Sequence, residues 1–428
     1  MVGLARSGAG AMRMLRAHGE AIGVDAGEPE QASALRDEGF EIHTGSDGID
    51  LLDRVRTVVK SPGVRPVSSV IAEARRRGVP VTGELELAWR LLPNEFVAVT
   101  GTNGKTTTVE LLGAIHRASG QPVAVAGNVG TAVSELVGEV NPEATVVCEV
   151  SSFQLADSES FGPEAAVLVN LGIDHLDWHR TPEEYGAAKL RVFANQRAGD
   201  VAVAPLRLID DGTVSGPAQR VSFGAPGADM EEADRELRWR RGPLIAVEQI
   251  RLRGAHNVEN AMAAAAGALA RGLPAEAVRD ALRTFGGVPH RLEEVAERGG
   301  VLFVNDSKAT NVESARVGIE AFEGGVHAIL GGRVEGDADF GELRDAVAAR
   351  CRAAYLIGEA ADGIGQALAG AVPLHLCGDL ERAVTDAAAA AGPGEVILLS
   401  PACKSFDRYR NFEERGEHFR RLVEELTE

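Results

Sequence analysis

The chain has 428 residues, of which 45% are hydrophobic and 4% aromatic, and this is enough to fill about two or three α/β cores. Its formal net charge of −19 argues against a nucleic-acid-binding protein, so an anionic ligand must be held by local donors. The four cysteines form no Cys-x-x-Cys pair and no apolar run is long enough to span a bilayer, so we expect a soluble protein of the reducing cytoplasm without a membrane partner.

The first segment, residues 1–83, has the pattern of short β/α units. A glycine-rich turn at residues 3–8 leads into a helix, and the strand at residues 22–25 ends in an acid, which is the layout of a dinucleotide-binding fold. A tight β–α turn without a ligand has the same pattern. Only two residues precede the turn, so either the first strand has been lost through a misplaced start or the sheet begins elsewhere. Residues 56–63 predict another buried strand that ends in a Pro-Gly turn.

A phosphate-binding loop opens the second segment, residues 84–287. A buried strand at residues 96–100 is followed by Gly-Thr-Asn-Gly-Lys-Thr-Thr at residues 101–107 and then by a helix. Glycines let backbone N–H groups surround a phosphate, Lys105 can reach the outer phosphates, and Thr106 offers a hydroxyl to Mg²⁺. The first glycine comes later than in the general pattern, so the loop is a shortened variant. Because the strand, the Gly-Lys-Thr and the helix coincide, a glycine-rich turn without a ligand is disfavoured.

Two further strands of this segment end in residues that could bind a metal ion. The strand at residues 144–150 carries Glu149, and the strand at residues 165–170 is followed by His175. Each residue by itself could be a solvated acid or a helix-capping histidine. Ligands of doubly wound sheets gather at the carboxyl ends of the strands, where both residues would lie beside the phosphate-binding loop. Their shared position therefore favours metal ligands.

Lys189 falls on the apolar face of a predicted helix. The helix begins at Thr181 with a capping box and has Pro182 at its first position. Lys189 lies one turn from Tyr185 and from Phe193, so desolvation could lower its pKa and leave a neutral amine for modification by CO₂, which would make it a metal ligand. The alternative, in which the lysine stem packs along the face and its ammonium stays in water, fits the pattern equally well.

Two asparagines begin an alanine-rich helix that ends near Gly272. Asn257 and Asn260 are three residues apart, so both amides lie on one side of the first turn, where they could read a purine edge. Helix capping is the alternative for Asn257, and it explains Asn260 less well.

The third segment, residues 288–428, repeats strand and helix signals and predicts a mostly parallel sheet. Its strands are expected at residues 302–305, 327–330, 354–357, 374–376 and 396–399. Polar loops follow three of them, at residues 306–311, 331–333 and 400–405. One such loop would be a solvated surface, but three at the same edge of the sheet indicate a binding face.

Taken together, the motifs resemble the Mur ligases, and the resemblance spans nearly the whole chain. It rests on the phosphate-binding loop and on residues 149–155 (Glu-Val-Ser-Ser-Phe-Gln-Leu), 174–175 (Asp-His), 187–191 (Ala-Ala-Lys-Leu-Arg), 256–257 (His-Asn), 289–291 (Pro-His-Arg), 305–311 (Asn-Asp-Ser-Lys-Ala-Thr-Asn) and 400–412, which begin Ser-Pro-Ala and end Asn-Phe. The resemblance implies three α/β domains. These are a Rossmann-like domain for a uridine-linked precursor at residues 1–83, a central P-loop ATPase domain with a mostly parallel sheet at residues 84–287 and a Rossmann-like amino-acid-binding domain at residues 288–428.

The resemblance also implies a reaction and its ligands. It predicts a monomeric, ATP-dependent ligase that joins D-glutamate to UDP-N-acetylmuramoyl-L-alanine through an acyl phosphate, with two Mg²⁺ ions, a carbamylated Lys189, and Lys105 and His175 as further catalytic residues. ATP is expected at Gly101, Thr102, Asn103, Gly104, Lys105, Thr106, Thr107, Asn257, Asn260, Arg291 and Asp306. The metal ions are expected at Thr106, Glu149, His175 and Lys189, and the uridine-linked precursor at Arg6, Ser7, Asp25, Gly63, Asn128 and Gln154. D-glutamate is expected at Lys308, Thr310, Ser405, Phe406 and Phe412.

One loop departs from the family pattern. Residues 331–337 lack a lysine that the family uses to bind a carboxylate of D-glutamate. A desolvated, unpaired carboxylate is costly, and Arg333 offers a planar fork that suits one, so Arg333 could take over with Glu335 turned to solvent. In the alternative, Arg333 is a surface residue, and Ser405 with backbone N–H groups suffices.

Three other functions fit part of the pattern. Another ligase of the superfamily, such as a folylpolyglutamate synthase or a different Mur enzyme, would differ in its acceptor or amino acid. A P-loop small-molecule kinase would release a stable phosphorylated product and would need no amine site. A nucleotide-binding protein without catalysis would have no use for the metal-ligand candidates.

Overall fold

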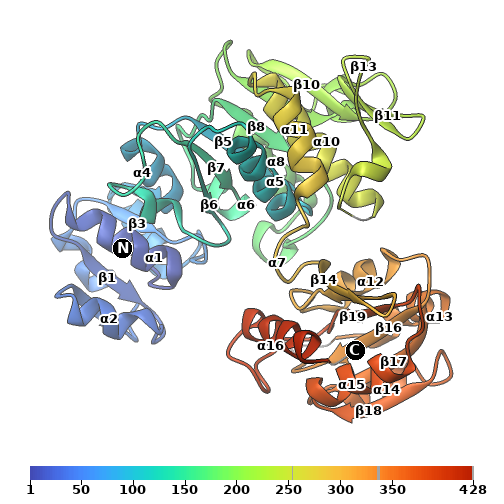
Figure 1. Ribbon diagram of the computed structural model, residues 1–428. Helices are drawn as coiled ribbons and strands as arrows, with labels where there is room; N and C mark the ends of the chain where they lie inside the picture. The colour runs from blue at the N-terminus through green and yellow to red at the C-terminus, as the bar shows by residue number, and fades with distance from the viewer. Residues whose placement is uncertain (253, 335–337, 427–428) are drawn as a thin grey trace. The chain divides into compact units, whose positions relative to one another are not determined.

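The computed structural model describes residues 1–252, 254–334 and 338–426 (Figure 1). The chain divides into two compact units, one formed by Met1–Ile250 with His256–Phe285 and the other by Arg251–Ala255 with Gly286–Glu428. Both units contain parallel sheets with helices between the strands, which confirms the α/β class. The first two predicted segments share one unit, so their division at residue 84 stays a prediction. None of the helices in the described ranges has the length and hydropathy that a membrane crossing requires.

The N-terminal part of the first unit is a small parallel sheet whose middle is formed by the first residues of the chain. Its strands and helices are β1 (Ile22–Asp25), β2 (Glu41–Thr44), β3 (Val58–Lys60), β4 (Val81–Gly83), α1 (Arg6–Arg16), α2 (Gln31–Asp37) and α3 (Ser69–Arg76). β1 pairs with β2 and β3 with β4, all in parallel. Val2 joins the two pairs, because it forms parallel bridges to both Val24 and Lys60. Val2 therefore lies between β1 and β3 in this sheet.

Glycines allow α1 to start directly after this strand. Gly3 has a φ of +85°, and a Cβ at Gly8 would lie 1.9 Å from the carbonyl oxygen of Gly3, so only glycine permits this close approach of helix and turn. Asp25 closes the turn from the end of β1. Its Oδ2 accepts a hydrogen bond from the N–H of Leu4 (2.7 Å), and its Oδ1 accepts one from the N–H of Gly27 (2.9 Å).

The rest of the first unit is built on a nine-stranded sheet with the order β13-β12-β11-β10-β9-β8-β5-β7-β6. Its strands are β5 (Phe96–Thr100), β6 (Val123–Gly127), β7 (Thr145–Glu149), β8 (Ala165–Leu168), β9 (Val201–Pro205), β10 (Gln219–Gly224), β11 (Met230–Ala233), β12 (Glu236–Trp239) and β13 (Gly242–Ala246). Every neighbouring pair from β11 to β6 is parallel, and β11–β12 and β12–β13 are antiparallel. The parallel centre confirms the sequence expectation, whereas β6 and the strands from β9 to β13 were not predicted.

The remaining helices of the first unit connect its strands or follow the last of them. They are α4 (Glu84–Leu91), α5 (Lys105–Ala118), α6 (Ser152–Ala156), α7 (Leu176–His179), α8 (Pro182–Leu190), α9 (Leu206–Asp210), α10 (Ala255–Ala270) and α11 (Ala275–Thr284), with short 3-10 helices at Ile49–Arg54, Val133–Leu136, Arg191–Phe193 and Val247–Gln249. α5 packs against α11, as Figure 1 shows. Every residue of β5 and of β8 is buried, which explains their continuous apolar runs. The phosphate-binding loop thus starts from a fully buried strand of the sheet.

The second unit contains a six-stranded sheet with the order β14-β15-β19-β16-β17-β18. Its elements are β14 (Glu293–Arg298), β15 (Val301–Asn305), β16 (Val326–Gly331), β17 (Cys351–Ile357), β18 (Leu374–Gly378), β19 (Val396–Leu399), α12 (Val312–Glu320), α13 (Arg344–Arg350), α14 (Ala361–Ala367), α15 (Leu380–Ala390), α16 (Phe412–Glu425) and a 3-10 helix at Phe340–Leu343. All five predicted strands are confirmed. Only β14, which pairs with β15 in antiparallel fashion, was missed.

Candidate active site

The phosphate-binding loop joins β5 to α5, as predicted. Gly104 occupies the position before α5 with a φ of +80°, and a Cβ there would lie 2.1 Å from Oδ1 of Asn260, so no larger residue fits. Lys105 folds back over the loop, and its Nζ donates hydrogen bonds to the carbonyl oxygens of Gly101 (2.9 Å) and Thr102 (2.9 Å). Thr106 and Thr107 are buried in the first turn of α5.

Asn170 holds this loop in shape, and the sequence analysis did not single it out. It follows β8, and its Oδ1 accepts hydrogen bonds from the N–H groups of Thr102 (2.9 Å) and Asn103 (2.9 Å). The hydroxyl of Tyr185, in α8, lies 3.2 Å from Oγ1 of Thr102. The end of β8 and the face of α8 therefore both support the loop. A lone asparagine after a predicted strand carries no local signal for this role.

Glu149 lies at the end of β7, beside the strand that leads into the loop, and its side chain is buried. Asn128, which follows β6, donates from Nδ2 to Oε1 of Glu149 (3.1 Å). The other carboxylate oxygen, Oε2, is buried without a hydrogen-bond partner. A buried acceptor without a donor costs free energy, so this oxygen fits a cation or a donor from a ligand.

Lys189 is also buried, and its Nζ reaches the phosphate-binding loop from α8. It donates to the carbonyl oxygen of Gly101 (2.6 Å) and lies 4.6 Å from the centre of the Tyr185 ring. Burial, together with the nearby charge of Lys105, lowers the pKa of Lys189 to about 7. The alternative in which its ammonium stays in water is therefore wrong, because the stem carries the amine into the interior.

The predicted capping box of α8 is only half formed. Thr181 accepts a hydrogen bond from the N–H of Glu184 (3.2 Å), and Pro182 is the first residue of the helix. The carboxylate of Glu184 bonds instead to Nη2 of Arg180 (2.8 Å). A nearby guanidinium competes for the carboxylate that would otherwise close the box.

His175 lies between β8 and α7 and is half exposed. Its backbone has a φ of +51°, and its ring lies 4.8 Å from the ring of Phe153 and 6.2 Å from that of Tyr185. Nε2 of His175 lies 3.5 Å from Oδ2 of Asp174. Among the residues that the structure describes, no group of three or more His, Cys, Asp or Glu side chains is close enough to hold a metal ion. A metal site here would need Lys189 or Thr106 as well.

The two asparagines of α10 lie next to the phosphate-binding loop. Nδ2 of Asn260 donates to Oδ1 of Asn257 (3.0 Å), and both side chains are buried. α10 begins at Ala255, so Asn257 lies inside the helix and the capping alternative is wrong. The predicted placement of both amides on one side of the first turn is confirmed.

The residues predicted for the uridine-linked precursor have structural partners in the first unit. Oγ of Ser7 lies 3.2 Å from Oγ of Ser61, and Asp25 accepts hydrogen bonds from the N–H of Leu4 in the glycine-rich turn and from the N–H of Gly27. Gln154 closes a capping box with Ser151 at the start of α6. Arg6 and Gly63 are exposed. Ser7, Asp25 and Gln154 therefore shape a turn or helix start, whether or not they also bind a ligand.

In the second unit, Asp306 follows β15 and is fully enclosed. Its Oδ2 accepts a hydrogen bond from the hydroxyl of Ser400 (2.7 Å), and its Oδ1 accepts one from the N–H of Leu292 (3.2 Å). Burial raises the pKa of Asp306 to about 7, and the charge of Arg291 works in the opposite direction. The predicted nucleotide residues Arg291 and Asp306 thus influence each other.

The three polar loops of this unit meet, as expected. A pocket of about 480 Å³ is lined by Thr310 and Arg333 together with Lys404, and the backbones of Arg333 and Lys404 form an antiparallel bridge. The side chain of Arg333 is 55% exposed, and its Nε lies 3.8 Å from Oε2 of Glu359. Glu335 lies outside the described residues. The remaining candidates differ: Ser405 is buried, Phe406 is exposed, and Nζ of Lys308 lies 5.6 Å from the Phe412 ring.

A buried arginine that the sequence analysis missed holds two of these loops together. Arg415 lies in α16, and its guanidinium donates to Oγ of Ser307 (2.9 Å), to the carbonyl oxygen of Ser307 (2.8 Å) and to that of Cys403 (3.1 Å). Its side chain is 1% exposed, and burial lowers its pKa to about 10. Arg415 therefore fixes the loops that carry Lys308 and Lys404.

Comparisons with known proteins agree on one family. The model of the Mur ligase middle domain matches residues 99–268, and that of the Mur ligase glutamate ligase domain matches residues 290–403. The chain is 43% identical to the UDP-N-acetylmuramoylalanine–D-glutamate ligase of Acidobacterium capsulatum, over 99% of this chain and 95% of that protein. It is 39% identical to the enzyme of the same name from Geobacillus kaustophilus, over 100% of this chain and 97% of that protein.

Solved structures share the fold at lower identity. The UDP-N-acetylmuramate-alanine ligase of Thermotoga maritima has a TM-score of 0.62 at 19% identity, with 99% of this chain and 98% of that chain covered. The MurF ligase of Thermotoga maritima, solved in complex with ADP, has a TM-score of 0.61 at 20% identity, with 87% and 96% covered.

Proposed function

Because the chain belongs to the Mur ligase family and, within it, to the UDP-N-acetylmuramoylalanine–D-glutamate ligases, we propose that it joins D-glutamate to UDP-N-acetylmuramoyl-L-alanine in peptidoglycan precursor synthesis. ATP would be converted to ADP and phosphate. The observation that carries the proposal, besides this relationship, is the convergence of Lys105 and Lys189 on the carbonyl oxygen of Gly101 in the phosphate-binding loop.

The first step activates the precursor, because a carboxylate is a poor electrophile. A carboxylate oxygen of the precursor attacks the γ-phosphorus of ATP, and the bond from that phosphorus to the bridging oxygen of ADP breaks, which yields an acyl phosphate. Negative charge spreads over the transferring group in this step. The ammonium of Lys105 would move from the carbonyl oxygens of Gly101 and Thr102 to the transferring phosphoryl group, where it would neutralise this charge.

The second step forms the amide. The nitrogen of D-glutamate attacks the carbonyl carbon of the acyl phosphate, the bond from that carbon to the phosphate oxygen breaks, and the amine loses a proton. His175 is proposed to accept this proton. Its half-exposed ring and its contact with Asp174, at 3.5 Å, would let the imidazole take a proton and pass it on to solvent.

The residues around the phosphate-binding loop fit Mg²⁺. Glu149 has one buried carboxylate oxygen without a hydrogen-bond partner, and Thr106 stands where the loop meets α5. The lowered pKa of Lys189 would leave part of it neutral near pH 7, so its nitrogen could add CO₂ and lose a proton to become a carbamate. We therefore propose that Thr106, Glu149, His175 and carbamylated Lys189 hold two ions. Bound Mg²⁺ would supply positive charge for phosphoryl transfer.

The same proposal assigns the remaining ligand contacts. Adenine would be read by Asn257 and Asn260, with Arg291 and Asp306 at the nucleotide as well. The uridine end of the precursor would lie against Arg6, Ser7, Asp25 and Gly63, with Asn128 and Gln154 nearer its reacting end. D-glutamate would be bound by Lys308, Thr310, Ser405, Phe406 and Phe412, with Arg333 in place of the lysine that this chain lacks. In support, Thr310 and Arg333 line one pocket.

The decisive experiment is mass spectrometry of the product. The purified protein is incubated with ATP, Mg²⁺, UDP-N-acetylmuramoyl-L-alanine and D-glutamate, and we expect the precursor to gain one glutamate residue while one ADP forms per product. L-glutamate, L-lysine and diaminopimelate serve as competing amino acids. A stable phosphorylated precursor formed without any amino acid would instead identify a kinase. Incorporation of a different amino acid in preference to D-glutamate would identify another ligase.

A further inference from the structure

One ion pair in the first unit is shielded from solvent. Nζ of Lys60 lies 2.6 Å from Oδ2 of Asp157, and the two side chains are 0% and 9% exposed. Lys60 ends β3 in the N-terminal sheet, whereas Asp157 follows α6 beside the nine-stranded sheet. A buried ion pair is often no more stabilising than apolar residues of the same size, so stability alone does not account for it.

Lys60 also organises the turn that follows β3. Its Nζ donates to the carbonyl oxygens of Ser61 (3.3 Å) and Val64 (2.5 Å), so its donors serve two carbonyl groups and one carboxylate. The same turn contains Gly63, and Oγ of Ser61 lies 3.2 Å from Oγ of Ser7. The buried ammonium therefore holds the turn through the carbonyl groups of Ser61 and Val64.

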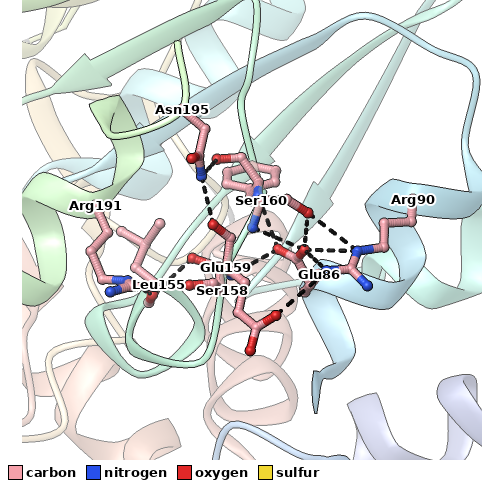
Figure 2. Close-up of polar contacts among 9 residues, drawn as sticks. Glu86, Arg90, Leu155, Ser158, Glu159, Ser160, Arg191 and Asn195 are labelled. Carbon is pink, nitrogen blue, oxygen red and sulfur yellow. Dashed lines mark hydrogen bonds and ion pairs between the residues drawn. The ribbon is translucent and has the colours of Figure 1, made fainter. Parts of the chain in front are cut away.

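Asp157 belongs to a segment, residues 155–161, that is anchored from several sides (Figure 2). The carboxylate of Glu86, in α4, accepts a hydrogen bond from the N–H of Ser160 (3.0 Å). Arg191 and Asn195 donate to carbonyl groups of the same segment, at 2.9 Å each. Because this segment is held independently of Lys60, Asp157 is a fixed point to which the N-terminal sheet is attached.

We infer that Lys60 and Asp157 are a positioning pair, which fixes the turn at residues 61–64 relative to α6 and so sets the distance between two parts of the precursor site. The inference rests on the proposed function, since the turn carries Gly63, proposed for the uridine end of the precursor, and α6 carries Gln154, proposed near its reacting end. A long ligand that is held at both ends depends on the spacing of its two subsites more than a short ligand does.

Aromatic contacts extend from this pair toward His175. Nζ of Lys60 lies 5.3 Å from the ring of Trp178, the ring of Trp178 lies 4.4 Å from that of Phe153, and the ring of Phe153 lies 4.8 Å from that of His175.

Burial lowers the pKa of Lys60 and raises the pKa of Asp157, so each depends on the other to remain charged. Loss of the pair should therefore affect the placement of the precursor and leave nucleotide binding intact.

The test uses two double variants of the full-length protein, because a single substitution would leave an uncompensated buried charge. Lys60→Met/Asp157→Leu replaces the pair by apolar side chains, and Lys60→Gln/Asp157→Asn replaces it by a neutral hydrogen-bonding pair. Calorimetric titration then measures Kd separately for UDP-N-acetylmuramoyl-L-alanine and for ADP with Mg²⁺. We expect the Kd of the precursor to rise about tenfold or more in the apolar variant, while the Kd of ADP changes by less than about twofold. The polar variant should lie between the apolar variant and the wild type.

The control removes a solvent-accessible ion pair from α3, in the same N-terminal part of the unit. Glu73→Leu/Arg76→Met acts on side chains that are 21% and 70% exposed, and we expect wild-type binding of both ligands. A folded apolar variant that binds the precursor as the wild type does would overturn the inference, as would equal weakening in the control. Two double variants that both fail to fold would make the pair a stability determinant and would also overturn it. A wild-type protein that does not bind the precursor would instead refute the proposed function.

Discussion

Lys189 combines a buried amine with a position at the phosphate-binding loop. Because its pKa is lowered to about 7, the neutral form needed for reaction with CO₂ is available near physiological pH. We predict that Lys189→Ala lowers kcat by about 10² to 10³, the typical cost of losing one preorganised electrostatic group. Added acetate or formate should restore part of the activity by placing a carboxylate in the vacated space. Wild-type turnover by a folded Lys189→Ala protein would contradict the assignment.

Asp306 should make stability depend on pH in an unusual direction. Its folded pKa of about 7 lies above its ordinary value of 3.8, so the folded state holds a proton that the unfolded state has lost between about pH 4 and 7. Its contribution to stability is therefore fully present below pH 4 and is lost as the pH rises to 7, by up to roughly 4 kcal/mol. We predict that the Tm of Asp306→Asn rises relative to wild type across this window. A constant difference from pH 4 to 8 would rule out the shifted carboxyl.

A substitution at Arg333 tests whether this side chain binds D-glutamate in place of the missing lysine. The side chain is 55% exposed, so its contribution should be smaller than that of a fully buried charge pair. We predict that Arg333→Ala raises the KM for D-glutamate roughly tenfold, about 1.4 kcal/mol, without changing the KM for ATP. Arg382→Ala, which removes an exposed arginine paired with Asp386, is the matched control. If Arg333→Ala leaves the KM for D-glutamate unchanged and Lys404→Ala raises it, the lysine holds that carboxylate instead.

Side-chain positions could be predicted from the sequence where they follow from local periodicity. Glu149 follows from the end of a strand, and the burial of Lys189 was one of two readings of a helix face that carries Tyr185. The supports of the site could not be predicted in this way. Asn170 lies 67 residues from its partner Asn103, and Asp157 is brought to Lys60 only by the tertiary fold. Local patterns contain no information about such pairings.

At the scale of elements, buried parallel strands were the most predictable features. β5, β7, β8 and most of the predicted strands of the second unit are largely apolar runs, because helices cover both faces of a parallel sheet. β18, at the edge of its sheet, is partly exposed. Two parallel strands, β6 and β9, were nevertheless missed. The other missed strands are of another kind. β11 and β12 form an antiparallel pair with the sequences Met-Glu-Glu-Ala and Glu-Leu-Arg-Trp, in which charged residues occupy half of the positions. β14 is likewise only partly buried, so periodicity gave no signal.

The connection between α6 and β8 is an element whose stability can be tested through one residue. Glu86 accepts hydrogen bonds from the N–H groups of Ser160 (3.0 Å) and Phe161 (2.9 Å), and Arg90 pairs with it at 2.6 Å (Figure 2). In Glu86→Gln, the amide NH₂ would face other donors, and a buried unsatisfied donor costs about 1 to 3 kcal/mol. We predict a lower Tm, measured by calorimetry, together with a weaker anchor for Asp157.

The control for this prediction is Glu95→Gln. Glu95 is 60% exposed and forms an ion pair with Arg271, so removal of its charge should change the Tm little. An equal fall in Tm for both variants would attribute the effect to lost charge rather than to the lost backbone contacts of Glu86.

At the scale of the whole molecule, the chain carries a large excess of negative charge. It has 63 acidic and 44 basic residues, for a formal net charge of −19. Such an excess repels itself and destabilises the compact state. Exposed ion pairs such as Arg54–Glu41 act in the opposite direction, but each is worth only about 0 to 1 kcal/mol. The proposed ligands are themselves anionic, so their binding depends on local donors such as those of the phosphate-binding loop.

We therefore predict that salt stabilises this protein. Raising NaCl from about 10 mM to about 150 mM shortens the Debye length from roughly 30 Å to roughly 8 Å, which screens repulsion between distant acids more than it weakens pairs in direct contact. The Tm at pH 7 should rise over this range, and KCl should give the same curve as NaCl because the effect depends on ionic strength alone. Sulfate and phosphate are avoided, since either could bind at the start of α5 and stabilise the protein by mass action. A Tm that falls with added NaCl would mean that the exposed ion pairs outweigh the net repulsion.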